Sequence, residues 1–192
     1  MHKDFYIFRH GETDYNKEQR WQGQGIDIPL NETGLIQAEK LANKLKDYKL
    51  EVVYSSPLIR ARQTAEKVAA QQNIKVKILN DLTESCVGVC EGMLRSEVAQ
   101  KFPDIWSEWY GKEMIMTTRW PEGESKLEVQ QRMFKAFNRM LSTSEKVIGV
   151  ASHGGAMRYF LLAFGYGPHK MPNTALFHLI YDNDKWILED LN

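Results

Sequence analysis

The chain has no excess charge of either sign. Its 192 residues include 25 lysines and arginines and 25 aspartates and glutamates. Without a net charge, the protein has no general attraction for nucleic acid or for an anionic membrane. Any anion that it binds must therefore be bound by a local group of side chains. No apolar run approaches the length of a membrane span, and the one near the N-terminus is too short for a signal-peptide core. We therefore expect a cytoplasmic protein that contacts neither nucleic acid nor membrane.

Cysteine is scarce, and linkers and repeats are absent. Cys86 and Cys90 stand four residues apart, with no second pair to complete a structural zinc site. In a cytoplasmic protein, we expect both cysteines to be reduced thiols. No low-complexity tract marks a domain boundary, and the 43% hydrophobic content suits one substantial core. We expect a single domain over residues 1–192.

Hydrophobic periodicity predicts strands that alternate with helices. Short apolar runs predict strands at residues 5–8, 52–54, 74–78 and 147–151. Apolar residues at helical spacing predict helices at 35–48, 58–69, 126–141 and 157–164, the second of them capped by the serines at 55 and 56. Two runs at 176–181 and 186–191 flank a turn-rich tetrapeptide and predict an antiparallel hairpin. The alternation indicates a single-domain, three-layer α/β/α fold with a mostly parallel central sheet.

Three of the predicted strands stop at polar residues of one chemical character. Arg9 and His10 follow the first strand, Ser55 through Arg60 follow the second, and His153 follows the late buried one. Because ligands gather beyond the carboxyl ends of parallel strands, these side chains should converge, and Gly11 should let the backbone approach a ligand closely. Arginines and histidines beside a helix N-terminus suit a compact anion, and phosphate is the obvious one.

A divalent metal is the alternative occupant of that edge. His10, His153, Glu12 and Glu84 are all possible ligands. Arg9 and Arg60 beside them would repel a cation, however, so the sequence favours an anion site with no metal and no cofactor. Glu12 remains open between a direct role and that of a structural partner for a backbone group.

Further motifs lie between these strand ends in a fixed order. They are Arg9-His10-Gly11-Glu12-Thr13 with Asn16, Gln22-Gly23, Pro29-Leu30 with Gly34, Ser55-Ser56-Pro57-Leu58 with Arg60, Ala61, Gln63 and Thr64, Leu82-Thr83-Glu84 with Gly88 and Glu91-Gly92, Pro121 with Gly123-Glu124-Ser125, and Ser152-His153-Gly154-Gly155. In order and spacing the whole set resembles the histidine phosphatase superfamily, which includes the cofactor-dependent phosphoglycerate mutases. The resemblance spans nearly the whole chain and implies the same fold.

The resemblance also implies a role for each matching residue. His10 would be the nucleophile that becomes phosphorylated, and Glu84 the general acid. Arg9, Arg60 and a protonated His153 would bind the phosphoryl group, with Asn16, Gln22, Gly23 and Gly154 as further substrate-binding residues. On physical grounds, neighbouring arginine charges should lower the pKa of His10 and keep its ring neutral and nucleophilic.

We therefore predict a phosphomonoester hydrolase that acts on a small phosphorylated metabolite. Mutase-type phosphoryl transfer and a non-catalytic phosphate-binding module are the alternatives. The aromatic-rich segment 93–120 is predicted either to cover the site as a lid or to form a satellite core or a self-association surface. The protein would then be a monomer or a homodimer.

Overall fold

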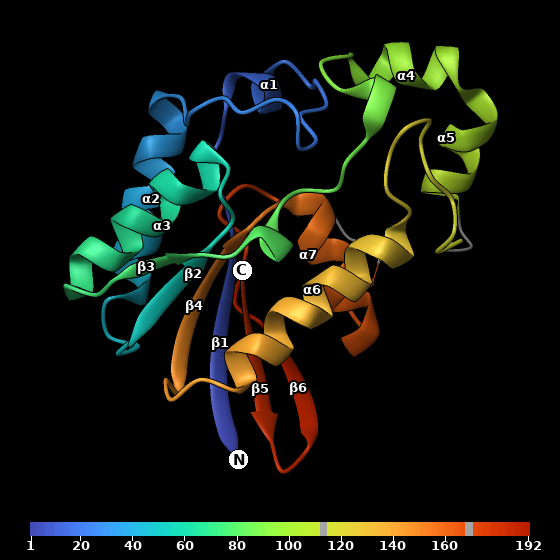
Figure 1. Cartoon of the computed structure of the whole chain (residues 1–192). Coiled ribbons are helices and arrows are strands. Elements are labelled where there is room, and N and C mark those ends of the chain that lie inside the picture. The colour runs from blue at the N-terminus through green and yellow to red at the C-terminus, as the bar shows by residue number, and fades with distance from the viewer. Residues whose placement is uncertain (112–114, 168–170) are drawn as a thin grey trace.

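The computed structural model describes residues 1–111, 115–167 and 171–192 and contains one twisted sheet (Figure 1). The strand order is β3-β2-β4-β1-β5-β6. The strands are β1 (His2–Arg9), β2 (Val52–Ser55), β3 (Val76–Ile78), β4 (Val147–Ser152), β5 (Leu176–Asp182) and β6 (Lys185–Asp190). The first four are mutually parallel, whereas β5 is antiparallel to β1 and to β6. The predicted mostly parallel sheet with a terminal hairpin is confirmed.

Helices cover both faces of this sheet. The longer ones are α2 (Glu32–Leu45) and α3 (Ile59–Gln72), which pack together on one face, and α6 (Lys126–Leu141) and α7 (Gly154–Leu161), which pack together on the other (Figure 1). The shorter ones are α1 (Asp14–Lys17), α4 (Arg95–Lys101), α5 (Pro103–Tyr110) and the 3-10 turns η1 (Asn80–Leu82), η2 (Gly88–Cys90) and η3 (Leu162–Phe164). The three-layer prediction is therefore confirmed. Within the described ranges, no helix is long and apolar enough to cross a membrane.

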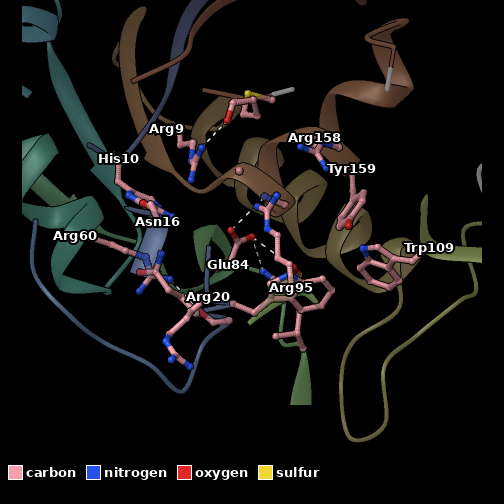
Figure 2. A pocket seen from close by; sticks show the side chains of 18 of the residues that line it. Arg9, His10, Asn16, Arg20, Arg60, Glu84, Arg95, Trp109, Arg158 and Tyr159 are labelled. Atoms are coloured by element: carbon pink, nitrogen blue, oxygen red, sulfur yellow. Dashed lines mark hydrogen bonds between the residues drawn. The ribbon is translucent and has the colours of Figure 1, made fainter. Parts of the chain in front are cut away.

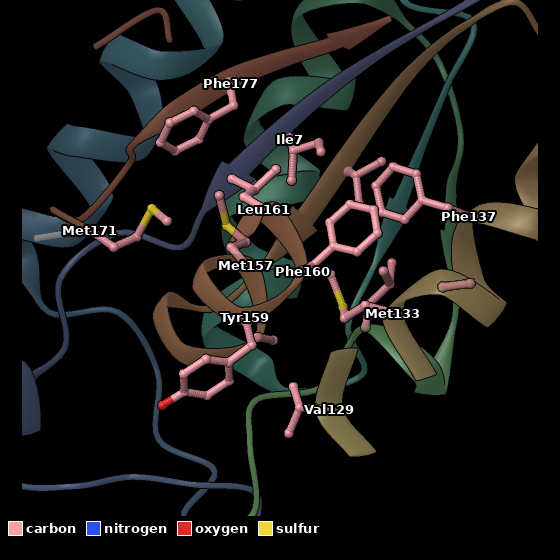
Figure 3. Packing of buried hydrophobic residues seen from close by; sticks show 14 of the residues in the cluster. Ile7, Val129, Met133, Phe137, Met157, Tyr159, Phe160, Leu161, Met171 and Phe177 are labelled. Atoms are coloured by element: carbon pink, nitrogen blue, oxygen red, sulfur yellow. The ribbon is translucent and has the colours of Figure 1, made fainter. Parts of the chain in front are cut away.

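The central strand β1 supplies both layers of the core. Successive side chains of a strand point to opposite faces. Phe5 and Ile7 accordingly join the cluster under α6 and α7, where Phe137 and Phe160 stack with centroids 4.3 Å apart (Figure 3). Tyr6 and Phe8 join the second cluster, under α2 and α3. A strand buried on both faces has no polar positions, which explains the unbroken apolar run in the sequence.

Three expectations about the boundaries of helices and strands were wrong. α3 begins at Ile59, and its N-cap is Leu58 with no side-chain cap, so Ser55 and Ser56 do not cap the helix. Ser55 is the last residue of β2, and Ser56 N donates to Ala151 O of β4 at 3.1 Å. α2 ends at Leu45 rather than near residue 48, and β3 begins at Val76 rather than at 74.

Gly11 lets the backbone approach another backbone segment, and not a ligand as predicted. A Cβ on Gly11 would lie 2.4 Å from the carbonyl oxygen of Gly34, and a Cβ on Gly34 would lie 2.1 Å from that of Glu12. The two glycines therefore allow the loop after β1 to pack against the first turn of α2. The close approach is to protein backbone, and it fixes the segment that presents His10.

Substitution of Gly34 by alanine tests this packing. Because the contacted atom is a backbone carbonyl that cannot rotate away, we expect Gly34→Ala to lower the free energy of unfolding by about 1–3 kcal/mol in urea titrations. Thr33→Ala, at the neighbouring exposed position of the same helix, is the control and should change stability by about 0.5 kcal/mol or less. Equal effects of the two substitutions would contradict the close packing.

Candidate active site

The ends of β1, β2 and β4 lie at one level of the sheet. Arg9 is paired with Ser152, and Ser55 with Ala151. His10 continues this pattern, since its N–H donates to Ser152 O at 3.1 Å. The residues that follow each strand therefore meet, as the sequence predicted. They form one wall of a pocket in which Arg9, His10 and Arg60 lie on one side of Glu84 and Arg158 and Tyr159 on the other (Figure 2).

His10 lies at the base of this pocket with 2% of its surface exposed. Its Nδ1 donates to Gly11 O at 2.6 Å, which leaves the Nε2 lone pair free to attack. Burial is the largest cause that lowers the pKa of His10 well below its usual value, and the charges of Arg9 and Arg60 add to it. The pKa moves in the predicted direction, although desolvation contributes more than the arginines do.

Arg9 and Arg60 supply the positive charge around His10. Arg60 is fully buried, and its Nη1 and Nη2 donate to Ile26 O at 2.8 Å and Gly23 O at 2.9 Å. Arg9 Nη1 donates to Met171 O at 2.5 Å. The Nε atom of each arginine is buried with no partner in the described part of the chain. Burial lowers the pKa of Arg9 to about 10, so Arg9 stays charged near neutral pH, and burial also lowers the pKa of Arg60. A bound anion would satisfy these donors.

His153 lies next to His10 and is not among the residues that line the pocket. Its ring is fully buried, with its centroid 5.1 Å from that of His10. Ser56 Oγ lies 2.7 Å from His153 Nε2, a partner that the sequence did not suggest. The expected protonated ring is not what this structure favours, because burial and then the Arg60 charge lower the pKa of His153 well below its usual value. Its Nδ1 has no partner among the described residues.

Glu84 projects into the pocket from the loop that follows η1. Its Oε1 accepts from Ser85 N at 2.8 Å and Ala156 N at 2.9 Å, and its Oε2 accepts from Gly155 N at 3.2 Å. The carboxylate therefore rests on the first turn of α7, where the helix dipole favours a negative charge. A Cβ on Gly155 would lie 2.6 Å from Glu84 Oε1, which explains the glycine. The position fits the predicted proton-transfer role.

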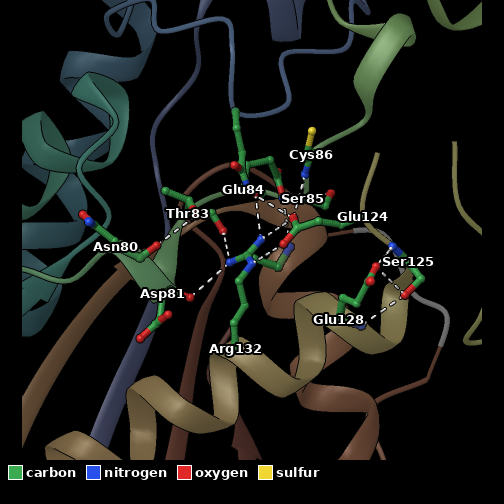
Figure 4. Close-up of polar contacts among 12 residues, drawn as sticks. Asn80, Asp81, Thr83, Glu84, Ser85, Cys86, Glu124, Ser125, Glu128 and Arg132 are labelled. Carbon is green, nitrogen blue, oxygen red and sulfur yellow. Dashed lines mark hydrogen bonds and ion pairs between the residues drawn. The ribbon is translucent and has the colours of Figure 1, made fainter. Parts of the chain in front are cut away.

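An arginine on α6 holds the Glu84 loop in place (Figure 4). Arg132 Nη1 donates to Asp81 O and Thr83 O, and its Nη2 donates to Glu84 O at 2.8 Å. The same guanidinium forms a bidentate ion pair with Glu124, with N–O distances of 2.8 and 3.0 Å. Sequence reasoning missed Arg132. A lone arginine in an amphipathic helix reads as a surface charge, and nothing local shows that three loop carbonyls converge on it.

The remaining predicted binding residues all line the pocket. Asn16 Oδ1 accepts from Thr13 N and from Asn173 Nδ2, and its own Nδ2 has no partner within the described residues. Gln22 is buried, with Oε1 unpaired in the described structure, and Gly154 lies beside Arg9. Gly23 has φ of 57°, and a Cβ there would lie 2.1 Å from Glu91 Oε1. Glu91 accepts from Gln24 N at 2.9 Å and Gly25 N at 2.8 Å and so holds the loop whose carbonyls bind Arg60.

Glu12 has the structural role that the sequence left open. Its Oε1 accepts from Asn31 Nδ2 at 3.0 Å, and its backbone N–H donates to Gln37 Oε1 at 2.8 Å. It does not line the pocket. Among the residues that the structure describes, no group of three His, Cys, Asp or Glu side chains is arranged to hold a metal ion.

The segment 93–120 contributes both to the core and to the pocket. Trp109 and Trp120 are buried, and Lys126 Nζ donates to Trp109 O at 3.1 Å. Trp109 also lines the pocket, together with Arg95 and Tyr110 at its exposed rim. Met114, named in the sequence among the aromatic and apolar residues of this segment, lies outside the described residues. A closing motion of the segment, or its use for self-association, stays a prediction.

The chain is similar to known proteins along nearly its whole length. The family model described as histidine phosphatase superfamily (branch 1) matches residues 5–192. The metal-independent phosphoserine phosphatase of Arabidopsis thaliana is 32% identical over an alignment of 195 residues, covering 97% of this chain and 79% of that protein. Probable phosphoglycerate mutase GpmB of Proteus mirabilis is 32% identical over 194 residues, covering 95% and 86%. The structure of Bacillus stearothermophilus YhfR superposes with a TM-score of 0.89 at 27% identity, covering 98% and 96%.

The two buried histidines make stability depend on pH. Because the pKa of each ring is lowered by folding, the unfolded chain binds more protons than the folded protein below about pH 6.5, the ordinary histidine value. The stabilisation is fully present above that pH and is lost as the pH falls. From about pH 6.5 to 5, we expect the free energy of unfolding in urea to fall by up to about 1.4 kcal/mol per pH unit for each ring.

A double variant isolates this effect. With His10→Asn and His153→Asn combined, the free energy of unfolding should fall less steeply over the same interval. Thr33→Ala, an exposed substitution that removes no titratable group, should keep the wild-type slope. Equal slopes in the wild type and the double variant would show that the rings are not held neutral by the fold.

Proposed function

This chain belongs to the histidine phosphatase superfamily, and from that membership and the geometry of its pocket we propose that it is a metal-independent phosphomonoester hydrolase with a phosphohistidine intermediate. The carrying observation is His10. Burial lowers the pKa of its ring, and the 2.6 Å hydrogen bond from Nδ1 to Gly11 O fixes the tautomer in which Nε2 is unprotonated, beside the charged Arg9 and the buried Arg60. A nucleophile ringed by cations suits a phosphoryl group, whose equatorial oxygens carry the negative charge.

In the first step, His10 Nε2 attacks phosphorus, an N–P bond forms, and the bond to the alcohol oxygen breaks. Arg9, Arg60 and Asn16 Nδ2 bind the equatorial oxygens, and the substrate phosphate brings His153 Nδ1 a negative partner that favours its protonated form. A monoanionic ester brings one proton, which Glu84 relays to the departing oxygen.

In the second step, water attacks the phosphohistidine from the side that the alcohol has left. Glu84 accepts the proton of this water, the N–P bond breaks, and His10 returns to its neutral form as phosphate leaves with the relayed proton. The single large displacement is thus divided into two smaller ones. The hydrogen bonds of Glu84 to the first turn of α7 support its presence as a carboxylate base at this stage.

Hydrolysis rather than mutase chemistry is favoured by the open rim of the pocket. A mutase must hold the phosphorylated enzyme and its reoriented substrate away from water. Here Arg95 and Tyr110 at the mouth are exposed to solvent. The sequence Arg20-Trp21-Gln22-Gly23-Gln24-Gly25 also resembles the phosphatase branch more than the mutase branch. Since a phosphatase and a mutase are equally similar to this chain at 32% identity, we rest the proposal on the pocket.

Phosphate release from para-nitrophenyl phosphate in the presence of a chelator tests this function. We expect activity to survive chelation and to fall by at least about a thousandfold in His10→Ala, because the nucleophile is lost. His2→Ala, a surface histidine, is the control and should keep full activity. Loss of activity on chelation would instead support metal-assisted hydrolysis.

A second assay separates hydrolysis from its alternatives. With 3-phosphoglycerate, a phosphatase releases inorganic phosphate, whereas a mutase produces the 2-phospho isomer. If no phosphomonoester of a broad panel is turned over, the pocket belongs to a phosphate-binding module and the proposed function is wrong.

The arrangement of Arg132 predicts a positioning role for it. Arg132→Lys keeps the charge but cannot hold three carbonyls and Glu124 at once. We expect kcat to fall about 10- to 100-fold with little change in KM, because the carboxyl group of Glu84 is displaced while the phosphate pocket is intact. The pH profile of kcat should shift as well, since Glu84 is the group that transfers protons. Arg119→Lys, on the surface beside Glu128, is the control; an unchanged pH profile in Arg132→Lys would leave it a merely structural residue.

A further inference from the structure

Positive charge in the pocket exceeds what one phosphoryl group requires. The residues that line it include five arginines, Arg9, Arg20, Arg60, Arg95 and Arg158. Among these described lining residues, Glu84 is the one carboxylate. Arg9 and Arg60 lie beside His10, and in the proposed reaction they bind the phosphoryl group. The other three arginines have no task in the proposed reaction.

Two of the three remaining arginines have no acidic partner among the residues that the structure describes. Arg20 is paired, since its Nε donates to Glu18 Oε2 at 2.9 Å and its Nη1 to Gly92 O at 2.8 Å. Arg158 Nε is buried with no partner within the described residues. Arg95 likewise forms no side-chain hydrogen bond or ion pair with any residue that the structure describes. A buried donor without a partner is costly, so a ligand that satisfies it gains the corresponding free energy.

The position of Arg95 is unfavourable for the protein itself. Arg95 is the first residue of α4, where the helix dipole disfavours a positive charge. Arg158 lies one turn beyond Gly154 on α7, on the side of Glu84 away from His10 (Figure 2). The charges of both lower the pKa of Arg9, which places them within electrostatic reach of the phosphate site.

We propose that Arg95 and Arg158 form a second anion subsite, and that the substrate is a phosphomonoester whose organic part carries a further anionic group. Tyr110 and Tyr159, which line the same part of the pocket, flank that group. This inference rests on the proposed function and names the substrate class of the same site. Carboxylate and phosphoryl groups share the chemistry that a guanidinium recognises, so either source of the second charge fits.

Paired substrates that differ by the second charge test this proposal. Glycerol 3-phosphate has a hydroxymethyl group where 3-phosphoglycerate has a carboxylate. Fructose 1,6-bisphosphate has one phosphoryl group more than fructose 6-phosphate. We expect kcat/KM to be about tenfold higher for the more anionic member of at least one pair, mainly through KM. The pair that shows the preference identifies the source of the charge. The preference should shrink at high ionic strength, because the rim is exposed.

Arginine variants connect the preference to these residues. In Arg95→Gln and in Arg158→Gln, the ratio of kcat/KM between the paired substrates should fall toward one. Arg62→Gln, an exposed position on α3 near Glu66, removes the same charge elsewhere and should keep the wild-type ratio. A ratio of one in the wild type, or a wild-type ratio retained in both pocket variants, would overturn the subsite.

Binding without turnover separates this proposal from the proposed function. Calorimetry compares propylphosphonate with 3-phosphonopropionate, which adds a carboxylate and cannot be hydrolysed. We expect about tenfold tighter binding of the second compound by the wild type and a loss of that difference in Arg158→Gln. Tight, carboxylate-dependent binding without any phosphatase activity would retain the subsite and reject the hydrolase. Turnover with equal binding of both phosphonates would retain the hydrolase and reject the subsite.

Discussion

The alignment of three strand ends is the constraint on which the site depends. β1, β2 and β4 are neighbours in the sheet, and their hydrogen-bond register places Arg9 opposite Ser152 and Ser55 opposite Ala151. The residues that follow these strands are therefore held at one level by backbone hydrogen bonds rather than by their own side chains. A shift of register by one residue would turn Arg9 and His10 to the opposite faces of the sheet and remove the pocket wall.

Burial then gives these residues their chemistry. The same desolvation that keeps His10 neutral also leaves nitrogen atoms of Arg9, Arg60 and Arg158 without partners in the described structure. Clustered cations of this kind destabilise a protein that has no ligand. Two backbone carbonyls offset this cost at Arg60. The first turn of α7 in turn stabilises the carboxylate of Glu84. The guanidinium nitrogens that have no partner in the described structure are available to bind an anion.

The sequence predicted the layers, the sheet and the main wall of the site, because hydrophobic periodicity and strand ends are local signals. It could not predict Arg132, whose role depends on loop carbonyls some 50 residues away in the chain, at Asp81, Thr83 and Glu84. Ser56 was misread as a helix cap for a related reason. Its partner, His153, comes from another strand end. Gly11 was read as a ligand contact, whereas its neighbour is Gly34 across a packing interface.

The central claim is that His10 carries the phosphoryl group between two displacements. Rapid quenching in base of a reaction with radiolabelled phosphomonoester, followed by peptide mapping at alkaline pH, measures this most directly. The account predicts an acid-labile, base-stable label on the peptide that contains His10, formed no more slowly than turnover and absent from His10→Ala. Phosphate release at the wild-type rate with no label on His10 would contradict it. Full activity of the His10→Ala variant would contradict it as well.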